Sequence, residues 1–263
     1  MAIIGTVESL WRYPVKSMRG EELDELFAGY NGVYGDRLFA IASSASPKGF
    51  PYFTGREQRE MIRYRPRFRD PEKAAQPVNW REAQMLSPLI NPIAATPEEL
   101  MIDVESPDGR KFAIDDPALL DHLRAGLDGG HELTLLRSEK AMTDCRPVSI
   151  FSLQTVNTLG AEAAMQVDKR RFRANVYLDL TNAAGFSEEE FVGRSLRLGS
   201  QVVVAVTNRD GRCKMILLDP DSAEQAPALL KAVAKNHEGK AGVYGAVLVE
   251  GIVRKGDPVE LLN

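Results

Sequence analysis

Cysteine is scarce in this sequence, and its scarcity excludes a scaffold held together by disulfides. The 263 residues include two cysteines, Cys145 and Cys213, which are far apart and belong to no CxxC pair. Disulfide-stabilised folds usually have many more cysteines at close spacing. We therefore expect both thiols to be reduced, which is typical of a cytoplasmic protein.

Long apolar runs are also missing. No stretch approaches the roughly 20 consecutive apolar residues that a helix needs to cross a membrane. The N-terminal segment MAIIGTVESLWRYPVKS has no basic start followed by an apolar run, so a secretory signal peptide is not expected. These absences predict a cytoplasmic protein that does not engage a membrane.

Positive charge is not in excess. Lys and Arg number 33 against 37 Asp and Glu, which leaves a net charge of -4. Proteins that bind nucleic acid are usually basic overall, so we expect no nucleic-acid partner. A local group of cations that binds a small anion is still compatible with this composition. The hydrophobic fraction of 44% predicts an ordinary folded core.

The common nucleotide-binding and hydrolytic motifs are absent. The sequence has no GxxxxGK[ST] phosphate loop, no GxGxxG dinucleotide fingerprint and no GxSxG nucleophile elbow. Its three histidines, at positions 122, 131 and 237, have no metal-ligand spacing. The remaining candidates for chemistry are therefore one cysteine and scattered cations.

Short strand-like segments are what the sequence has in number. The pattern predicts strands over 2–11 and 33–43 and a hairpin over 99–116 with its turn at Pro107-Asp108-Gly109. Helices are predicted over 117–127, 152–163 and 227–239, with Ser152 as an N-cap. Many short strands with few helices favour a strand-rich, barrel-like α+β fold. We place a domain boundary between 115 and 116.

Four arginines alternate with other residues between 63 and 69. The period of two predicts a strand that carries the arginines on one face, and Pro66 restricts it to the edge of a sheet. A run of charge like this is usually a solvated surface.

Cys213 is the candidate for chemistry. It follows the turn signal 209–211 and lies between Arg212 and Lys214. Neighbouring cations favour the thiolate, which attacks electrophiles and binds soft metals. In an extended segment, however, Arg212 and Lys214 would point away from the face of Cys213. Cys145 has one acidic and one basic neighbour, and a packed, inert thiol stays an alternative for either cysteine.

Two segments in the first half suit a small anion. Residues 14–20, PVKSMRG, combine a positive charge, a hydroxyl and a permissive glycine. Arg37, in the element GDR, either pairs with Asp36 or forks onto an anion. A solvated loop is the alternative for both segments.

The order of these motifs resembles one family. VESLWRYPVKSMRGEEL, GVYGDRLFAI and FTGREQREM are similar to the N-terminal β-barrel domain that precedes MOSC domains. PVSIFSLQTVNTL, RRFRANVYLDL, FVGRSLRLG, RCKMILLDPDS and IVRKGDPVEL resemble the MOSC domain itself, which is named for the C-terminal part of molybdenum cofactor sulfurases. One motif alone is weak, but the set in this order is specific. The resemblance covers nearly the whole chain except about 70–98.

The resemblance implies a fold and a cofactor site. A β-barrel-like N-terminal domain (1–115) would pack on a MOSC β-barrel domain (116–263) with a few peripheral helices, and the molybdenum cofactor, molybdopterin, would lie in a cleft between them. Cys213 would be the catalytic residue and the molybdenum ligand. The residues that match cofactor-binding positions of the family are Lys16, Ser17, Arg37, Thr54, Arg56, Ser152, Arg173, Asn175, Arg212 and Asp219.

The resemblance also implies a function. We expect an oxidoreductase that reduces N-hydroxylated or related N–O compounds, with electrons from a separate ferredoxin- or cytochrome-like donor and its reductase. Departures from the family pattern, FRAN for FRPN and Ile216-Leu217 in place of threonines, leave the substrate open. One alternative is a carrier of molybdenum cofactor or sulfur, with Cys213 as ligand or persulfide. Another is an anion-binding protein in which Cys213 is structural.

Overall fold

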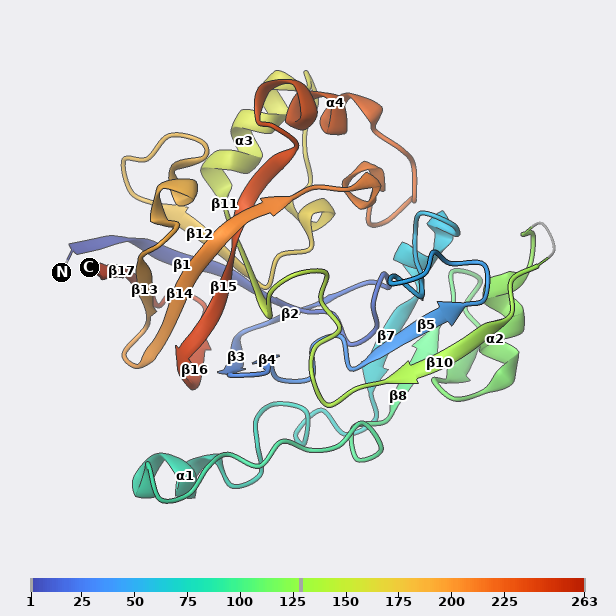
Figure 1. Ribbon diagram of the computed structural model, residues 1–263, viewed down its shortest axis with the longest axis horizontal. Coiled ribbons are helices and arrows are strands. Elements are labelled where there is room, and N and C mark those ends of the chain that lie inside the picture. Colours follow the sequence, from blue (N-terminus) through green and yellow to red (C-terminus); the bar gives the residue numbers. More distant parts are fainter. Residues whose placement is uncertain (1, 128–129, 263) are drawn as a thin grey trace. The chain divides into compact units, whose positions relative to one another are not determined.

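The computed structural model describes residues 2–127 and 130–262, and the chain divides into two compact units (Figure 1). The barrel unit comprises Met1–Arg12, Gly20–Val33 and Thr143–Asn263, and the second unit comprises Tyr13–Arg19 and Tyr34–Met142. The units therefore alternate along the chain, and a domain boundary between 115 and 116 stays a prediction. Within the described residues, none of the helices has the length and apolar character to span a membrane.

Seven strands of the barrel unit form a closed β-barrel, in the order β12-β11-β15-β14-β13-β17-β1, and β1 pairs back with β12. The N-terminal strand thus lies between strands from the C-terminal half, as the colours of Figure 1 show. Closure leaves these strands without an open edge. The strands are β1 (Ala2–Arg12), β11 (Val148–Ser152), β12 (Val176–Leu180), β13 (Ser195–Leu198), β14 (Val202–Gly211), β15 (Lys240–Val249) and β17 (Pro258–Leu262).

Burial alternates along the barrel strand β14. Val202, Val204 and Val206 of β14 are buried, whereas the residues between them are partly exposed. At the closing pair, Gly5 of β1 lies opposite Leu180 of β12, and a Cβ on Gly5 would come within 2.2 Å of a backbone oxygen in β12. Glycine is therefore required where β1 joins the barrel.

Smaller elements surround the barrel. A three-stranded sheet contains β16 (Gly251–Arg254), β3 (Glu25–Gly29) and β4 (Gly32–Val33), and β2 (Glu21–Leu23) pairs with β1. The helices α3 and α4 contact each other, and each contacts a barrel strand. The helical elements of this unit are α3 (Leu153–Glu162), α4 (Pro227–Asn236) and the 3-10 helices η2 (Lys169–Phe172), η3 (Ser187–Phe191) and η4 (Lys214–Leu217).

The second unit is built on two three-stranded sheets, with the orders β10-β5-β6 and β7-β8-β9. Its core is a separate cluster that includes Phe39, Phe53 and Met61. The elements are β5 (Phe39–Ser43), β6 (Tyr52–Phe53), η1 (Arg59–Arg63), β7 (Arg65–Phe68), α1 (Trp80–Leu86), β8 (Ile102–Glu105), β9 (Lys111–Ala113), α2 (Pro117–Arg124) and β10 (Leu133–Arg137).

The strand-rich α+β class is confirmed, as are the hairpin β8–β9 and the helix starts at Pro117 and after Ser152. The predicted strand over 33–43 is wrong as a single element. Val33 ends β4, a turn follows, and β5 begins only at Phe39. Arg37 has φ 49° in this turn, a left-handed conformation that interrupts an extended chain.

The arginine-rich strand is confirmed for part of its predicted length. β7 begins at Arg65 and lies at the edge of its sheet, with Pro66 and Phe68 buried and its arginines exposed. Arg63 belongs to η1 instead. Arg69 pairs with the carboxylate of Asp103 at 2.7 Å, so part of this charged surface is neutralised locally.

Candidate functional site

Cys213 lies at the junction between a barrel strand and a short helix. β14 ends at Gly211 and η4 begins at Lys214, so Cys213 is the N-cap residue of a 3-10 helix and keeps an extended backbone. The extended backbone therefore continues to Cys213 and ends there. The thiol is half-buried, and its sulfur makes no hydrogen bond within the described residues.

Arg212 anchors the chain immediately before Cys213. Its Nε donates to the carbonyl of Ala241 at 2.7 Å, and its Nη1 donates to the carbonyl of Phe172 at 2.9 Å. Its Nη2 lies 2.9 Å from the Asp210 carboxylate, and the side chain is only 6% exposed. The guanidinium is thus held by groups in the interior of the barrel unit.

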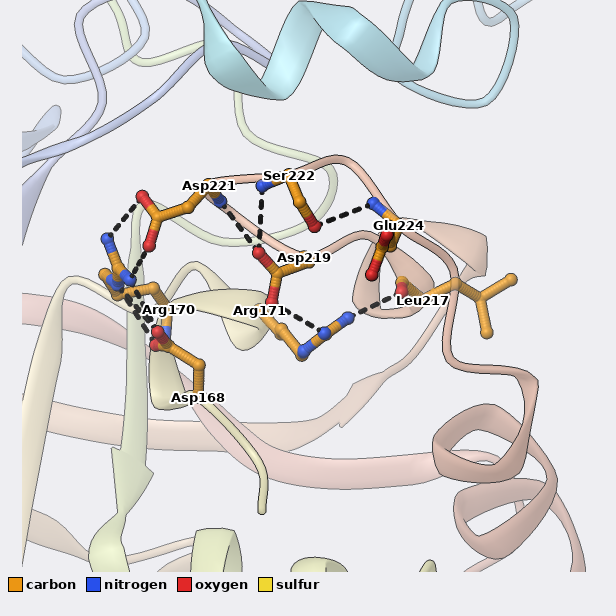
Figure 2. A network of polar contacts seen from close by, with 8 residues as sticks. All are labelled: Asp168, Arg170, Arg171, Leu217, Asp219, Asp221, Ser222 and Glu224. Atoms are coloured by element: carbon orange, nitrogen blue, oxygen red, sulfur yellow. Dashed lines mark hydrogen bonds and ion pairs between the residues drawn. The ribbon is translucent and has the colours of Figure 1, made fainter. Parts of the chain in front are cut away.

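A second anchor fixes the turn after η4, as Figure 2 shows. One oxygen of Asp219 accepts hydrogen bonds from the backbone nitrogens of Asp221 and Ser222, both at 3.0 Å. The other accepts from Arg171 Nη2 at 2.9 Å, while Arg171 Nη1 donates to the carbonyl of Leu217 at 2.6 Å. Asp219 therefore organises the DPDS turn, and Arg171 ties that turn to η2.

Arg170, the neighbour of Arg171 in η2, forms a more exposed pair of contacts in the same view (Figure 2). Its guanidinium lies 2.6 Å from Asp168 and 2.5 Å from Asp221. Hydrogen bonds from Arg170 hold the pKa of Asp168 below its usual value, although burial acts in the opposite direction. Arg170 thus contacts the same turn at Asp221.

Ser152 belongs to a buried polar cluster at the start of α3. Its Oγ donates to the Glu188 carboxylate at 2.7 Å and accepts from the backbone nitrogen of Thr155 at 3.1 Å. Glu188 also accepts from the Thr155 hydroxyl at 2.8 Å, and both Ser152 and Glu188 are fully buried. The structure therefore places Ser152 as a helix cap with an internal partner.

Asn175 connects three barrel strands. Its side-chain oxygen accepts from the Ser149 nitrogen at 3.2 Å, and its side-chain nitrogen donates to the Trp11 carbonyl at 3.2 Å. The nearby Arg173 ends η2 in a left-handed conformation with φ 54°. Both residues of the FRAN motif therefore shape the backbone where η2 leads into β12.

In the second unit, Lys16 and Arg56 share one aromatic ring. Arg56 Cζ lies 4.4 Å from the centroid of the Phe50 ring, and Lys16 Nζ lies 5.7 Å from the same centroid. Lys16 Nζ also lies 4.6 Å from the Tyr52 centroid and donates to the Met142 carbonyl at 2.9 Å. Two cations are thus gathered at aromatic faces, to which they are attracted.

Thr54 holds the Arg56 side chain through a hydrogen bond. Its hydroxyl accepts from Arg56 Nε at 3.1 Å and donates to the Glu57 carboxylate at 2.7 Å. Thr54 is buried, whereas Arg56 is exposed and forms no ion pair within residues 2–127 and 130–262. The TGR element therefore presents a guanidinium to solvent on a fixed backbone.

Arg37 and Ser17 lie on adjacent segments beside this group. Arg37 N donates to the Tyr13 carbonyl at 2.7 Å, and Lys16 N donates to the Phe39 carbonyl at 2.8 Å, so the two segments run side by side. Ser17 and Arg37 both have left-handed backbones, with φ 66° and 49°. Arg37 forms an ion pair with the fully buried Asp36, which is one of the two arrangements that the sequence allowed.

The predicted site residues therefore form two groups. The second unit brings together Lys16, Ser17, Arg37, Thr54 and Arg56, and the barrel unit contains Cys213, Arg212, Asp219, Ser152, Arg173 and Asn175. Sequence reasoning missed Arg171, Phe50 and Tyr52. Arg171 lies inside the RRFRAN motif, and Phe50 and Tyr52 lie four and two residues before Thr54 of the TGR element, so proximity to a motif was the available signal.

Solved structures share parts of this fold. The fold is similar to the crystal structure of the YuaD protein from Bacillus subtilis, with a TM-score of 0.50 and 14% identity over 98% of this chain and 96% of that one. A weaker similarity joins 45% of this chain to 55% of YiiM from Geobacillus stearothermophilus, with a TM-score of 0.36 and 21% identity. No curated protein matches the chain significantly.

Two family descriptions match in sequence order. The MOSC N-terminal beta barrel domain matches residues 4–112, and the MOSC domain matches residues 137–260. MOSC domains are found in proteins that bind molybdenum cofactor. Because the two matches together span most of the sequence, the chain belongs to the MOSC-domain proteins that carry a MOSC N-terminal β-barrel domain.

Proposed function

We propose that this protein binds molybdenum cofactor and reduces N-hydroxylated or related N–O small molecules. The observation that carries the proposal is the placement of Cys213 in a MOSC domain: its thiol is half-buried, makes no hydrogen bond within the described residues, and lies on a segment anchored on both sides. A soft donor atom in a fixed position is better suited to bind a metal than a thiol whose position varies.

The chemistry of the donor set fits the cofactor. A thiolate is a suitable ligand for molybdenum, which is soft enough to accept sulfur. Lys16 and Arg56 provide charged donors of the kind that bind phosphate, and Arg56 is exposed without a carboxylate partner in the described part of the chain. In the barrel unit Cys213 would ligate the metal, and in the second unit Lys16, Ser17, Arg37, Thr54 and Arg56 would hold phosphate and pterin.

The other predicted cofactor contacts are engaged with internal groups. Ser152, Asn175, Arg212 and Asp219 each hydrogen-bond to partners in the barrel unit. We propose that these four residues support the cofactor site by fixing the backbone around it. Direct contact of these residues or of Arg173 with the cofactor stays a prediction. Such support is a common role for residues behind metal ligands.

The reaction must balance two electrons and two protons. They convert an N–OH group to N–H and water, and we propose that the electrons come from a separate ferredoxin- or cytochrome-like donor with its reductase. When bound, the cofactor would supply the redox chemistry at its metal. The chain itself would provide the anchoring cations and the fixed thiol.

The experiment is metal and pterin analysis of protein purified from a molybdenum-replete host. Wild type is expected to contain both molybdenum and releasable pterin, and Cys213→Ser is expected to lose molybdenum. Cys145→Ser is the matched control, because Cys145 is exposed and lies outside the anchored segment. Near-zero molybdenum in the wild-type protein would overturn the proposal.

A turnover assay separates the reductase from the cofactor or sulfur carrier. A simple amidoxime and a chemical reductant replace the unknown substrate and donor. Turnover that disappears in Cys213→Ser supports the reductase. Protein that retains molybdenum and pterin but shows no turnover supports the carrier instead.

A further inference from the structure

The short helix η2 contacts the Cys213 segment upstream of the thiol. The carbonyl of Phe172, the last residue of η2, accepts a hydrogen bond from Arg212 Nη1 at 2.9 Å. Arg212 is also held by the Ala241 carbonyl at 2.7 Å. The residue directly before Cys213 is therefore tied to η2 and to the barrel at the same time.

The same helix contacts the segment downstream of the thiol through Arg171. Its two terminal nitrogens are divided between the Leu217 carbonyl at 2.6 Å and the Asp219 carboxylate at 2.9 Å (Figure 2). Leu217 is the last residue of η4, the helix that Cys213 caps. Residues 212–219 are thus clamped at both ends by adjacent residues of one helical turn.

The two arginines that make these contacts, Arg171 and Arg212, are nearly excluded from water. The side chain of Arg171 is 7% exposed and that of Arg212 is 6% exposed. A buried guanidinium that loses a partner leaves an unsatisfied charge, so such contacts hold their geometry firmly. A lysine would keep the charge but could not bridge a carbonyl and a carboxylate with a planar fork.

We propose that Arg171 is the positioning residue for Cys213. By tying Leu217 and Asp219 to η2, it keeps η4 wound and holds the thiol at a constant depth and direction. Its role requires no contact with the sulfur. The proposal deepens the proposed function, on which its metal readout rests, but the effect on the thiol is measurable in metal-free protein.

The test compares Arg171→Gln and Arg171→Lys with Arg170→Lys. Arg170 is the matched control because it lies next to Arg171 in η2 but forms its ion pairs with Asp168 and Asp221 instead of Leu217 and Asp219. All variants carry Cys145→Ser, so that Cys213 is the one thiol. The first readout is the rate at which an aromatic disulfide reagent modifies Cys213 in metal-free protein.

We expect both Arg171 variants to react faster, by about tenfold or more, because a lost charge-assisted hydrogen bond lets the segment open. The Arg170→Lys rate should stay near the parent value. Thermal unfolding confirms that each protein is folded, and Arg171→Lys keeps the test valid if Arg171→Gln fails to fold. Unchanged rates in folded Arg171 variants, or an equal rise in Arg170→Lys, would overturn the proposal.

The second readout is the ratio of molybdenum to pterin in protein from a molybdenum-replete host. Arg171 variants should retain pterin while losing molybdenum, because the metal ligand is displaced but the cations of the second unit are intact. If the wild type contains no molybdenum, the proposed function fails, whereas the thiol rates still decide the positioning role. A normal ratio of molybdenum to pterin together with unchanged thiol rates in the Arg171 variants would overturn the proposal that Arg171 positions Cys213.

Discussion

The guanidinium of Arg212 and the carboxylate of Asp210 lie 2.9 Å apart, and both side chains are almost completely excluded from water. The two residues lie at the end of β14, just before Cys213. Ser149 Oγ adds a hydrogen bond to the same carboxylate at 3.2 Å. This pair therefore belongs to the internal support of the thiol, and its buried charge makes it sensitive to pH.

Ionisation of the Asp210 carboxyl should make the free energy of unfolding depend on pH. Burial raises its pKa above the usual 3.8, although Arg212 acts in the opposite direction. The folded protein therefore keeps this proton at a pH where the unfolded chain has released it, so the free energy of unfolding falls as pH rises through that window. Relative to Asp210→Asn, wild type should gain stability as pH falls from the raised pKa towards 3.8.

Denaturant unfolding of both proteins at a series of pH values is the measurement. Because the raised pKa means that ionisation of Asp210 costs the folded protein free energy, the stability of wild type relative to Asp210→Asn should decrease as pH rises towards neutral. Parallel pH profiles for the two proteins would contradict the predicted shift.

Removing Arg56 should weaken cofactor retention. Its exposed guanidinium is held over Phe50 and by Thr54, in a position to bind phosphate. We expect Arg56→Ala to lose bound pterin during washing about tenfold or more readily than wild type, which corresponds to one lost charge-assisted hydrogen bond. Pterin fluorescence after denaturation measures this loss.

Arg59→Ala is the control for that prediction. Arg59 is also an exposed arginine, and its ion pair with Glu60 is long, at 3.8 Å. Pterin content should be unchanged in this variant. A similar loss in both variants would mean that general surface charge, rather than the TGR element, retains the cofactor.

Ser152→Ala should lower stability without changing the metal-to-pterin ratio. The substitution removes the cap of α3 and one hydrogen bond to the buried Glu188. The expected loss is about 2–3 kcal/mol, of which the cap alone accounts for about 1 kcal/mol. Denaturant unfolding measures it, with Asp116→Ala, which removes the partly exposed cap of α2, as the comparison for a cap without a buried partner.

A changed metal-to-pterin ratio in Ser152→Ala would favour direct contact with the cofactor instead. Equal losses of stability in Ser152→Ala and Asp116→Ala would show that the bond to Glu188 contributes little.

The two thiols should be distinguishable by their rate of modification in metal-free protein. Cys145 is exposed and Cys213 is half-buried, so access favours Cys145. A thiol reagent should therefore react in two phases, of which Cys145→Ser abolishes the fast one and Cys213→Ser the slow one. The reverse assignment would show that Cys213 is more accessible than its burial indicates.

Much of the fold follows from local patterns in the sequence. The Pro107-Asp108-Gly109 turn predicts the hairpin of β8 and β9, and Ser152 predicts the start of α3. The split between β4 and β5 was not predictable, because the turn that contains Arg37 is held by a distant segment: Arg37 N donates to the Tyr13 carbonyl at 2.7 Å, and Tyr13 N donates to the Asp36 carboxylate at 2.7 Å.

The order of motifs by itself determined the family of this protein and singled out Cys213, because a set of short motifs in one order is specific even where each is weak. Only the tertiary structure decided what surrounds the thiol. It directed Arg212 into the barrel interior, placed Arg171 against a turn that lies 46 and 48 positions further along the chain, and made both arginines buried anchors. Contacts over such distances depend on closure of the barrel and on burial, which local sequence patterns do not encode.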